Sequence, residues 1–250
     1  QVKLNKFKLF FYGVKILNYD VLFLHQSYPS YYLLTKNPDK PIILYYHGAS
    51  NRIQRTNFKI SMMLYKNKIS KIMAVSQAGI NQMKKMIGDI SAEVIYNGVD
   101  TNFYNPDLSR PFTKGTPQLL FVSALRPYKK ASLLISFMPD LLKKYPKIHL
   151  QIVGTGEEKS SLENLVKKLK LENHVELTGR IDDDELKLRY SSCDVYVSAS
   201  TFEVCPVPTL EAMACGKPLV LFDIEPHQEI INISNAGKIF SLDKNSNFIT

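Results

Sequence analysis

Short apolar segments alternate with amphipathic segments along the second half of the chain. Five apolar segments with the length of buried strands lie at 118–124, 148–154, 174–179, 193–200 and 217–222. Between them, apolar residues recur at helical spacing in the segments 133–145, 157–171, 183–192 and 208–216. Strands that alternate with helices in this way form βαβ units, which build a parallel sheet with crossover helices on its faces. This half is predicted to be a doubly wound, Rossmann-like domain.

The first half shows the same alternation less regularly. Strand candidates lie at 20–25, 41–48, 71–76 and 92–98, and a helical pattern follows the third of them. A polar segment with three prolines and one glycine, residues 105–117, is typical of a linker. The pattern therefore predicts an α/β protein with two Rossmann-like domains, residues 1–112 and 113–250, that face each other across a cleft. Ligands of such sheets bind outside the carboxyl ends of the strands, so the cleft is the expected site.

The charge is distributed unequally between the two halves. Residues 1–112 carry 15 Lys and Arg against 6 Asp and Glu, a net charge of +9, whereas residues 113–250 carry 17 of each kind. The first half also holds 17 of the 27 Tyr and Phe residues. A basic, aromatic surface fits an anionic membrane or a phosphorylated substrate, and equally a solvated lysine-rich surface. Nucleic acid is not expected as a partner, because the basic half has no helix-turn-helix, RRM or zinc-finger pattern.

Cysteine usage and hydropathy bear on the compartment. The three cysteines have no paired spacing, which fits a reducing cytoplasm better than a disulfide framework or a zinc site. The apolar stretch 9–17 is interrupted by a glycine and a lysine and is shorter than the roughly 18 residues of a membrane span. We expect a cytoplasmic protein that is soluble or peripheral at the inner face of the membrane.

The segment 201–222 places two carboxylates around the start of a helix. Pro208 suits the first helical turn, because its missing N–H would have no partner there, and Gly216 supplies a stop. The N-terminus of such a helix offers backbone N–H groups and a positive dipole end to an anion such as a diphosphate. Glu203 precedes the helix and Glu211 lies about one turn into it, where carboxylates can accept hydrogen bonds from a ribose or a sugar. Together these groups predict a nucleotide-sugar site.

The order of several motifs resembles the retaining family-4 glycosyltransferases of GT-B fold, also described as glycosyl transferases group 1. Glu203 and Glu211 are similar to the Glu-x7-Glu signature of that family. The motifs before them follow the family's order: YYHG, KIMAVS, VIYNGVDTNFYNP, LLFVSALRPYKK, LQIVGTGEE and VELTGR. The resemblance covers nearly the whole chain, without the family's N-terminal strand and glycine-rich loop and without closing helices. It implies a GT-B architecture with an incomplete N-terminal domain, truncated at both ends.

The resemblance implies a role for each residue that matches a family motif. Glu203 would bind hydroxyls of the donor sugar, Lys129 would neutralise the donor diphosphate, and His47 would be the active-site histidine of the acceptor domain. Glu211 would bind the ribose. Further donor contacts are implied at Arg126, Gly154, Gly156, Arg180, Pro206, Val207, Thr209 and Leu210. The family moves a sugar from a nucleotide diphosphate sugar to a hydroxyl acceptor with retention, and the basic first half favours a lipid-linked or phosphorylated acceptor.

Two positions depart from the family pattern. Ala124 stands where the family has an arginine, although Arg126 could reach the same phosphate, and Pro206 replaces a glycine and removes one backbone N–H. An inactive relative that binds nucleotide sugar and a nucleotide-sugar epimerase of the same architecture therefore remain alternatives. The sequence has no Walker loop and no histidine-rich metal pattern, so no cofactor or metal is expected beyond the nucleotide-sugar co-substrate.

Overall fold

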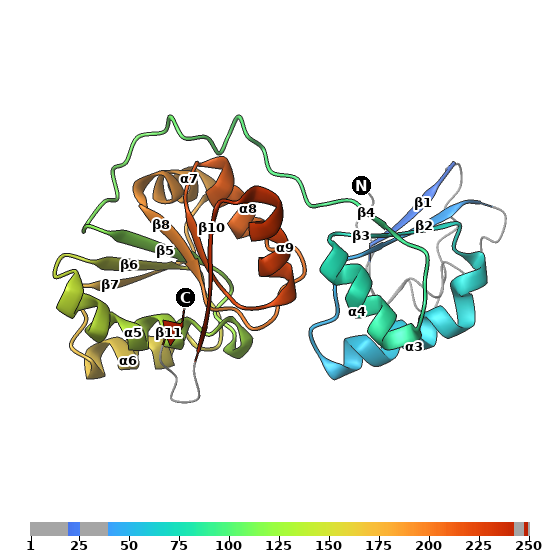
Figure 1. Cartoon of the computed structure of the whole chain (residues 1–250), viewed down its shortest axis with the longest axis horizontal. Helices are drawn as coiled ribbons and strands as arrows, with labels where there is room; N and C mark the ends of the chain where they lie inside the picture. Colours follow the sequence, from blue (N-terminus) through green and yellow to red (C-terminus); the bar gives the residue numbers. More distant parts are fainter. Residues whose placement is uncertain (1–19, 26–39, 243–247, 250) are drawn as a thin grey trace. The chain divides into compact units, whose positions relative to one another are not determined.

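The chain forms two compact α/β units, residues 1–97 and 98–250, each built on a sheet whose strands are all or mostly parallel (Figure 1). The computed structural model describes residues 20–25, 40–242 and 248–249. The apolar stretch 9–17 lies outside these residues. In the part of the chain that is described, no helix has the length and apolar character needed to cross a membrane.

Unit 1 contains a four-stranded parallel sheet in the order β1-β2-β3-β4. Its elements are β1 (Leu22–His25), β2 (Ile42–Tyr46), α3 (Arg52–Tyr65), the 3-10 turn η1 (Lys66–Lys68), β3 (Lys71–Ala74), α4 (Gln77–Ile87) and β4 (Glu93–Val94). The four strands and α4 were predicted from the sequence. Helix α3 was not predicted, although Phe58 and Met62 mark its buried side.

Unit 2 contains a seven-stranded sheet in the order β11-β10-β9-β8-β5-β6-β7. Its strands are β5 (Gln118–Val122), β6 (His149–Val153), β7 (Val175–Gly179), β8 (Val195–Ser198), β9 (Leu219–Phe222), β10 (Gly237–Leu242) and β11 (Phe248–Ile249). The pairs are parallel except for the antiparallel pair β10–β11. Its helices are the 3-10 turn η2 (Pro127–Lys129), α5 (Ala131–Lys144), α6 (Lys159–Lys168), α7 (Asp183–Ser192), α8 (Val207–Ala214) and α9 (Glu225–Ser234). The predicted doubly wound domain is confirmed.

The strand order of unit 2 contains a topological switch point. The chain runs from β5 to β6 and β7 on one side, and then returns to β8 on the other side of β5. Helices α5 and α6 cover one face of the sheet, and α7 and α8 cover the opposite face (Figure 1). Two apolar cores follow this division, one containing Ile135 and Leu162, the other containing Tyr190 and Ala212. The loops after β5 and β8 therefore leave adjacent strands in opposite directions, the arrangement that opens a ligand crevice in α/β sheets.

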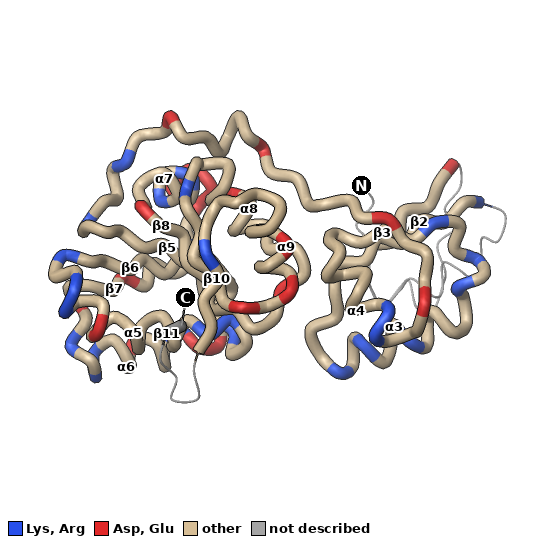
Figure 2. Tube along the Cα trace, in the orientation of Figure 1, with Lys and Arg blue, Asp and Glu red and all other residues tan. Residues whose placement is uncertain are grey.

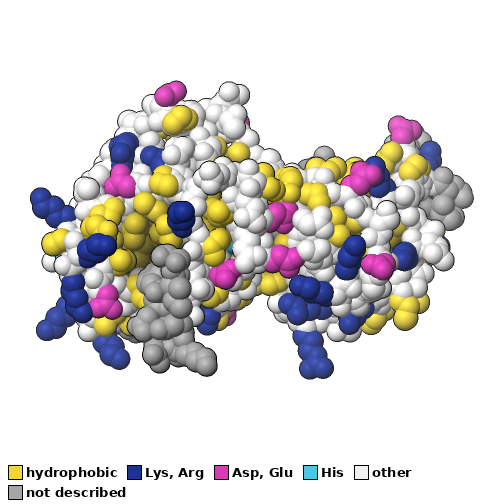
Figure 3. Space-filling model, in the orientation of Figure 1, with side chains coloured by type: hydrophobic (Ala, Val, Ile, Leu, Met, Phe, Trp, Pro, Cys, Tyr) yellow, Lys and Arg dark blue, Asp and Glu magenta, His cyan; other side chains and the backbone are white. Residues whose placement is uncertain are grey.

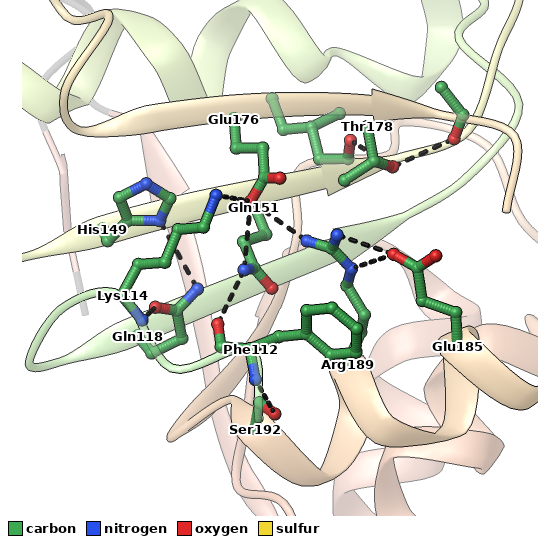
Figure 4. A network of polar contacts seen from close by, with 12 residues as sticks. Phe112, Lys114, Gln118, His149, Gln151, Glu176, Thr178, Glu185, Arg189 and Ser192 are labelled. Carbon is green, nitrogen blue, oxygen red and sulfur yellow. Dashed lines mark hydrogen bonds and ion pairs between the residues drawn. The ribbon is translucent and has the colours of Figure 1, made fainter. Parts of the chain in front are cut away.

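A polar network joins the predicted linker to unit 2 (Figure 4). At its centre the Glu176 carboxylate of β7 lies 3.0 Å from Arg189 Nη1 and 3.1 Å from Lys114 Nζ. Gln151 of β6 donates to the Phe112 carbonyl at 2.9 Å, and the Arg189 guanidinium lies 4.3 Å from the Phe112 ring centroid. These contacts make the end of the predicted linker part of unit 2.

Earlier residues of the same segment are fixed in the same way. Arg110 Nη2 lies 2.5 Å from Asp194 Oδ1, and the Ser191 hydroxyl donates to the Leu108 carbonyl at 2.7 Å. The compact units accordingly divide between Asn97 and Gly98, earlier than the predicted boundary at 112/113. The linker-like composition marked an irregular segment correctly, but side chains of α7 and the sheet hold that segment against unit 2.

Candidate active site

The loop after β5 carries the first group of the site. It turns through η2, where Lys129 is the last residue, and Lys130 then adopts a left-handed conformation with φ 53° and starts α5. Lys130 is exposed, whereas only 15% of the Lys129 side chain is accessible. The bend at Lys130 thus separates two neighbouring lysines into different environments. It favours Lys129 over Lys130 as the cation of the site.

The loop after β8 brings a carboxylate to Lys129. Lys129 Nζ lies 2.5 Å from Glu203 Oε1, and the Glu203 side chain is 13% exposed. Thr201 holds the two loops together, because its N–H and its hydroxyl both donate to the Tyr128 carbonyl, at 2.8 and 3.0 Å. The adjacency of β5 and β8 therefore produces a nearly buried ion pair at the switch point.

This ion pair keeps unused hydrogen-bonding capacity. An ammonium has three N–H donors and a carboxylate has about four acceptor positions, so a single contact between them leaves donors and acceptors free. Lys129 can still donate to phosphate oxygens while Glu203 accepts from sugar hydroxyls. The low exposure of both side chains strengthens such contacts relative to water. A phosphorylated sugar is a ligand that could bind the Lys129 ammonium and the Glu203 carboxylate at the same time.

The N-terminus of α8 is more restricted than the sequence analysis expected. Pro206 and Pro208 have no N–H, while the N–H groups of Thr209 and Leu210 both donate to the Pro206 carbonyl. Within this described stretch, Val207 is left as the backbone donor that a phosphate could meet, and its side chain is exposed. Thr209 is buried. The donor contacts assigned to residues 206–210 remain predictions, with the Val207 N–H as the best placed group.

Glu211 lies on α8 and is held by a tyrosine. The Tyr190 hydroxyl of α7 donates to Glu211 Oε2 at 2.7 Å, and the Tyr104 hydroxyl lies near enough to affect the pKa of this carboxyl. Burial raises the pKa of the Glu211 carboxyl, and the two hydroxyls offset part of that rise. Tyr190 takes one acceptor position and others remain, so a structural role and a contact with a ribose diol are compatible.

Gly154 and Gly156 follow β6 and lie against the loop after β5. A Cβ atom on Gly154 would lie 1.9 Å from the Ser123 carbonyl oxygen, and one on Gly156 would lie 2.3 Å from that of Leu125. Only glycine permits this close backbone approach. Both residues thus position the loop that carries Arg126 and Lys129, a packing role that accounts for them without a donor contact.

Two arginines complete the set predicted in unit 2. Arg126 is exposed, and its guanidinium lies 3.4 Å from the Tyr128 hydroxyl. Arg180 directly follows β7 and is also exposed. Both follow carboxyl ends of strands in the same sheet. Neither has its position fixed by a carboxylate among the described contacts, so both side chains are available to an anionic ligand.

Sequence reasoning missed His227 at the start of α9. Its Nδ1 lies 2.8 Å from the Phe222 carbonyl, which makes Nδ1 the protonated nitrogen. The side chain is fully buried, Nε2 has no hydrogen-bond partner among the described residues, and burial lowers the pKa of the imidazole. His227 follows β9 and Glu203 follows β8, the parallel neighbour of β9. Both residues therefore lie at the edge of the sheet where the carboxyl ends of the strands meet. No local motif marks this position in the sequence.

His47 belongs to unit 1 and follows β2. Its Nε2 lies 2.8 Å from Nδ1 of His25, the last residue of the adjacent strand β1. Burial, followed by the electrostatic effect of His25, lowers the pKa of His47, which favours the neutral imidazole at neutral pH. Gln82 of α4 anchors the loop by accepting from the Ala49 N–H at 2.9 Å. The sequence contained a signal for His25, since both histidines end neighbouring strand patterns.

The structure thus brings Lys129 and Glu203 into direct contact and places Glu211 on the helix that follows. In the described residues, no group of three or more His, Cys, Asp or Glu side chains is arranged to hold a metal ion. The site in unit 2 therefore consists of one ion pair, exposed arginines and one backbone donor at a helix start.

Known proteins share this architecture. The profile of the glycosyl transferases group 1 family matches residues 108–245, and that of glycosyltransferase family 4 matches residues 6–103. A crystal structure of HepE from Anabaena in complex with UDP and glucose superposes with a TM-score of 0.72 and 23% identity, covering 89% of this chain and 64% of that one. The expected GT-B fold is confirmed.

Curated relatives are longer than this chain. The phosphatidyl-myo-inositol mannosyltransferase of Mycolicibacterium smegmatis is 26% identical over 232 residues, 90% of this chain and 59% of that protein. An uncharacterized glycosyltransferase of Haemophilus influenzae is 39% identical over 108 residues, 43% of this chain and 30% of that protein. The chain thus spans at most about three fifths of these two relatives. Because the group 1 profile matches more than half of its residues, the chain belongs to the glycosyl transferases group 1 family.

Proposed function

We propose that this protein transfers a sugar from a nucleotide diphosphate sugar to a hydroxyl acceptor, with retention of configuration. The observation that carries the proposal is the Lys129–Glu203 ion pair between the loops after β5 and β8. A cation and a carboxylate at one switch point match the diphosphate and the sugar hydroxyls of a single ligand. The family membership and the HepE complex with UDP and glucose support the same ligand class.

In this proposal each residue of unit 2 acts on a different part of the donor. Lys129, with Arg126 beside it, balances the charge that builds on the leaving diphosphate, and Glu203 orients the sugar through its hydroxyls. Glu211 accepts hydrogen bonds from the ribose. Arg180 and the Val207 N–H are further partners for phosphate oxygens. His47 of unit 1 is assigned to the acceptor side, where its neutral imidazole can exchange hydrogen bonds with a hydroxyl.

The reaction proposed is a displacement on one face of the sugar. The bond between the anomeric carbon and the diphosphate oxygen breaks, and the acceptor oxygen bonds to the same carbon from the same face. The acceptor proton passes to the departing phosphate, so the nucleoside diphosphate leaves with it. No side-chain nucleophile is needed in this scheme, and electrostatic stabilisation of the leaving group by Lys129 is its largest catalytic contribution.

A lipid-linked or phosphorylated acceptor is the preferred class. It is supported by the net charge of +9 on residues 1–112, which is 15 Lys and Arg minus 6 Asp and Glu. A relative named for mannosyl transfer to phosphatidyl-myo-inositol points in the same direction. The donor base and sugar are left open, so the test has to use a panel of donors.

The test is turnover of UDP-, GDP- and ADP-sugars by the purified chain, with nucleoside diphosphate release as the readout and a lipid-linked sugar or alcohol as acceptor. We expect one donor class to release its diphosphate, and the anomeric signal of the product in NMR to match that of the donor. An inverted anomeric centre would contradict retention. Isomerised donor in the absence of acceptor would favour an epimerase, and tight binding without release would favour an inactive relative, which Pro206 and Ala124 make the second candidate.

A further inference from the structure

Helix α3 of unit 1 presents apolar side chains to solvent. Phe58 and Met62 attach it to the sheet, yet Ile53, Ile60, Met63 and Leu64 are 65%, 43%, 79% and 58% exposed. Ile53, Ile60 and Leu64 are spaced by seven and four residues, so they line one stripe of the helix. Each lies close to half a turn away from the buried pair. The outward face of α3 is therefore apolar along its length.

A row of cations runs beside this apolar stripe. Arg52 and Lys59 lie about a quarter turn from Ile53 and Ile60, whereas Arg55 lies nearer the side of Phe58, and η1 adds Lys66 and Lys68; all five cations are exposed. Residues 52–68 contain no Asp or Glu. Figure 2 shows Lys and Arg along α3 and the turn after it. Figure 3 shows dark blue side chains along the lower edge of unit 1, with yellow ones beside them.

These cations are not neutralised inside the described fold. Among the described residues none of the five forms an ion pair, whereas Lys71 on the neighbouring strand pairs with Glu93 at 2.7 Å. The Arg55 side chain donates to the Ala49 carbonyl at 3.2 Å, a contact that leaves its charge unbalanced. The exposed surface of α3 thus combines an apolar stripe with cations that have no ion pair among the described residues. A partner that is both apolar and anionic would match this surface.

We propose that α3 is the surface by which unit 1 binds an anionic membrane. The apolar stripe (Ile53, Ile60, Leu64) would enter the boundary between headgroups and acyl chains, and the basic row would stay at the level of the lipid phosphates. A second copy of the chain is a poor occupant, because a symmetric contact would place the same cations against each other. The proposal is independent of the donor chemistry of unit 2, which uses other residues.

The experiment is flotation of the full chain with vesicles of phosphatidylcholine alone or with phosphatidylglycerol added. We expect binding to the anionic vesicles that disappears at high salt, as required for charges at a surface. The apolar test is Ile53→Glu, because Ile53 lies in the first turn of α3, where a glutamate favours the helix. Its matched control is Ile233→Glu on α9 of unit 2, since Ile233 is 67% exposed against 65% for Ile53. Only the first substitution should lower binding, by tenfold or more.

The basic row is tested separately, with substitutions that leave the apolar stripe intact. Each Lys or Arg close to anionic lipid contributes about a fivefold factor in partitioning, so Arg52→Ser with Lys59→Ser should lower binding about 25-fold. The control is Lys167→Ser with Lys168→Ser on α6, which removes the same charge from exposed positions of unit 2. Thermal unfolding and circular dichroism verify that all four variants are folded.

Three results would overturn the proposal. They are equal binding to neutral and anionic vesicles, equal losses in the α3 variants and their controls, and no binding of the wild-type chain to anionic vesicles at low salt. Self-association that Ile53→Glu abolishes, without vesicle binding, would assign the surface to a second copy instead. Nucleotide-sugar binding by the same samples is a separate readout, so a failed donor site and a failed membrane surface give different results.

Discussion

Charged side chains are arranged differently in unit 2 and on α3 of unit 1. In unit 2, Lys129, Arg189 and Lys114 each contact a carboxylate, at 2.5, 3.0 and 3.1 Å. On α3 and η1, five exposed cations form no ion pair within the described residues. The charge balance of the sequence indicates the same contrast. Residues 113–250 carry 17 basic and 17 acidic residues, whereas residues 1–112 carry 15 basic and 6 acidic residues.

The paired cations of unit 2 stabilise the fold and form the site, whereas the exposed cations of α3 are available to an anionic partner. A cation held by a buried carboxylate has a fixed position, and removing it leaves a desolvated charge behind. An exposed, unpaired cation adds almost nothing to stability, but it attracts an anionic surface. Substitutions of the two kinds should therefore differ in size and in what they affect.

The largest effect on stability is expected for Arg189→Ala. The Arg189 side chain is 7% exposed and contacts both Glu176 and Glu185. Its removal leaves these carboxylates partly buried and should lower the free energy of unfolding of unit 2 by about 3 kcal/mol. Lys59→Ala on α3 should change it by less than about 0.5 kcal/mol. Urea unfolding followed by circular dichroism measures the free energy of unfolding of both variants. Similar losses in the two variants would show that paired and unpaired cations do not differ in their effect on stability.

The largest effect on turnover is expected for Lys129→Ala. Loss of a preorganised cation at the leaving diphosphate should lower kcat by about 10²–10³-fold, whereas Lys130→Ala should stay within about twofold. The structure separates the two lysines because Lys129 is paired with Glu203 and Lys130 is exposed. In Lys129→Ala the nearly buried Glu203 carboxylate loses its cation. The double variant Lys129→Ala with Glu203→Gln controls for the effect of that unpaired charge. A larger loss in Lys130→Ala would assign the role to Lys130.

The two glutamates of the signature should separate binding from turnover. Glu211→Ala should weaken nucleoside diphosphate binding by about tenfold or more, because a hydrogen bond to a charged group is worth about 1.5–3 kcal/mol. Glu203→Ala should lower turnover with a smaller loss of that binding. Tyr190→Phe removes a structural partner of Glu211 without touching the ribose contact, so it is the control. Calorimetry with the free diphosphate decides, and equal losses for both glutamates would reject these roles.

The smallest effect is a dependence of stability on acid pH in unit 2. Burial would raise the pKa values of Glu176 and Asp194, but hydrogen bonds and neighbouring cations outweigh it and lower both. A lowered carboxyl pKa stabilises the fold above the ordinary value near 4, and this stability is lost as the pH falls through the lowered value. Glu176→Gln should reduce the decrease of the unfolding temperature between neutral and acid pH. An unchanged decrease would show that the network does not couple to pH.

The regular elements of unit 2 could be predicted from the sequence, because strands buried on both faces and amphipathic helices leave clear patterns. The α8 helix is an example, since Pro208 lies in its first turn and Gly216 follows it with φ 68°. Helix α3 was missed although residues 52–65 have a helical period, with Phe58 and Met62 on the buried side. The compact units divide at 97/98 and not at the predicted 112/113, because the contacts that hold residues 108–114 come from distant parts of the chain.

The sequence suggested the residues of the candidate site but not their geometry. Lys129 and Glu203 were identified through the family resemblance, yet their contact depends on the adjacency of β5 and β8, which no local pattern encodes. The same applies to the contact between His25 and His47 and to the position of His227 in α9, the helix after β9. The restricted donors at the start of α8 also depend on which carbonyl the Thr209 and Leu210 N–H groups meet.

Binding of nucleoside diphosphates shows whether the Lys129–Glu203 pair holds the donor. Titration calorimetry of UDP, GDP and ADP with wild-type protein, Lys129→Ala and Lys130→Ala needs no knowledge of the acceptor. We expect one diphosphate to bind the wild type and Lys130→Ala equally, and to bind Lys129→Ala about ten- to a hundredfold more weakly. Equal affinity of all three proteins, or no binding of any diphosphate to the wild type, would contradict this expectation.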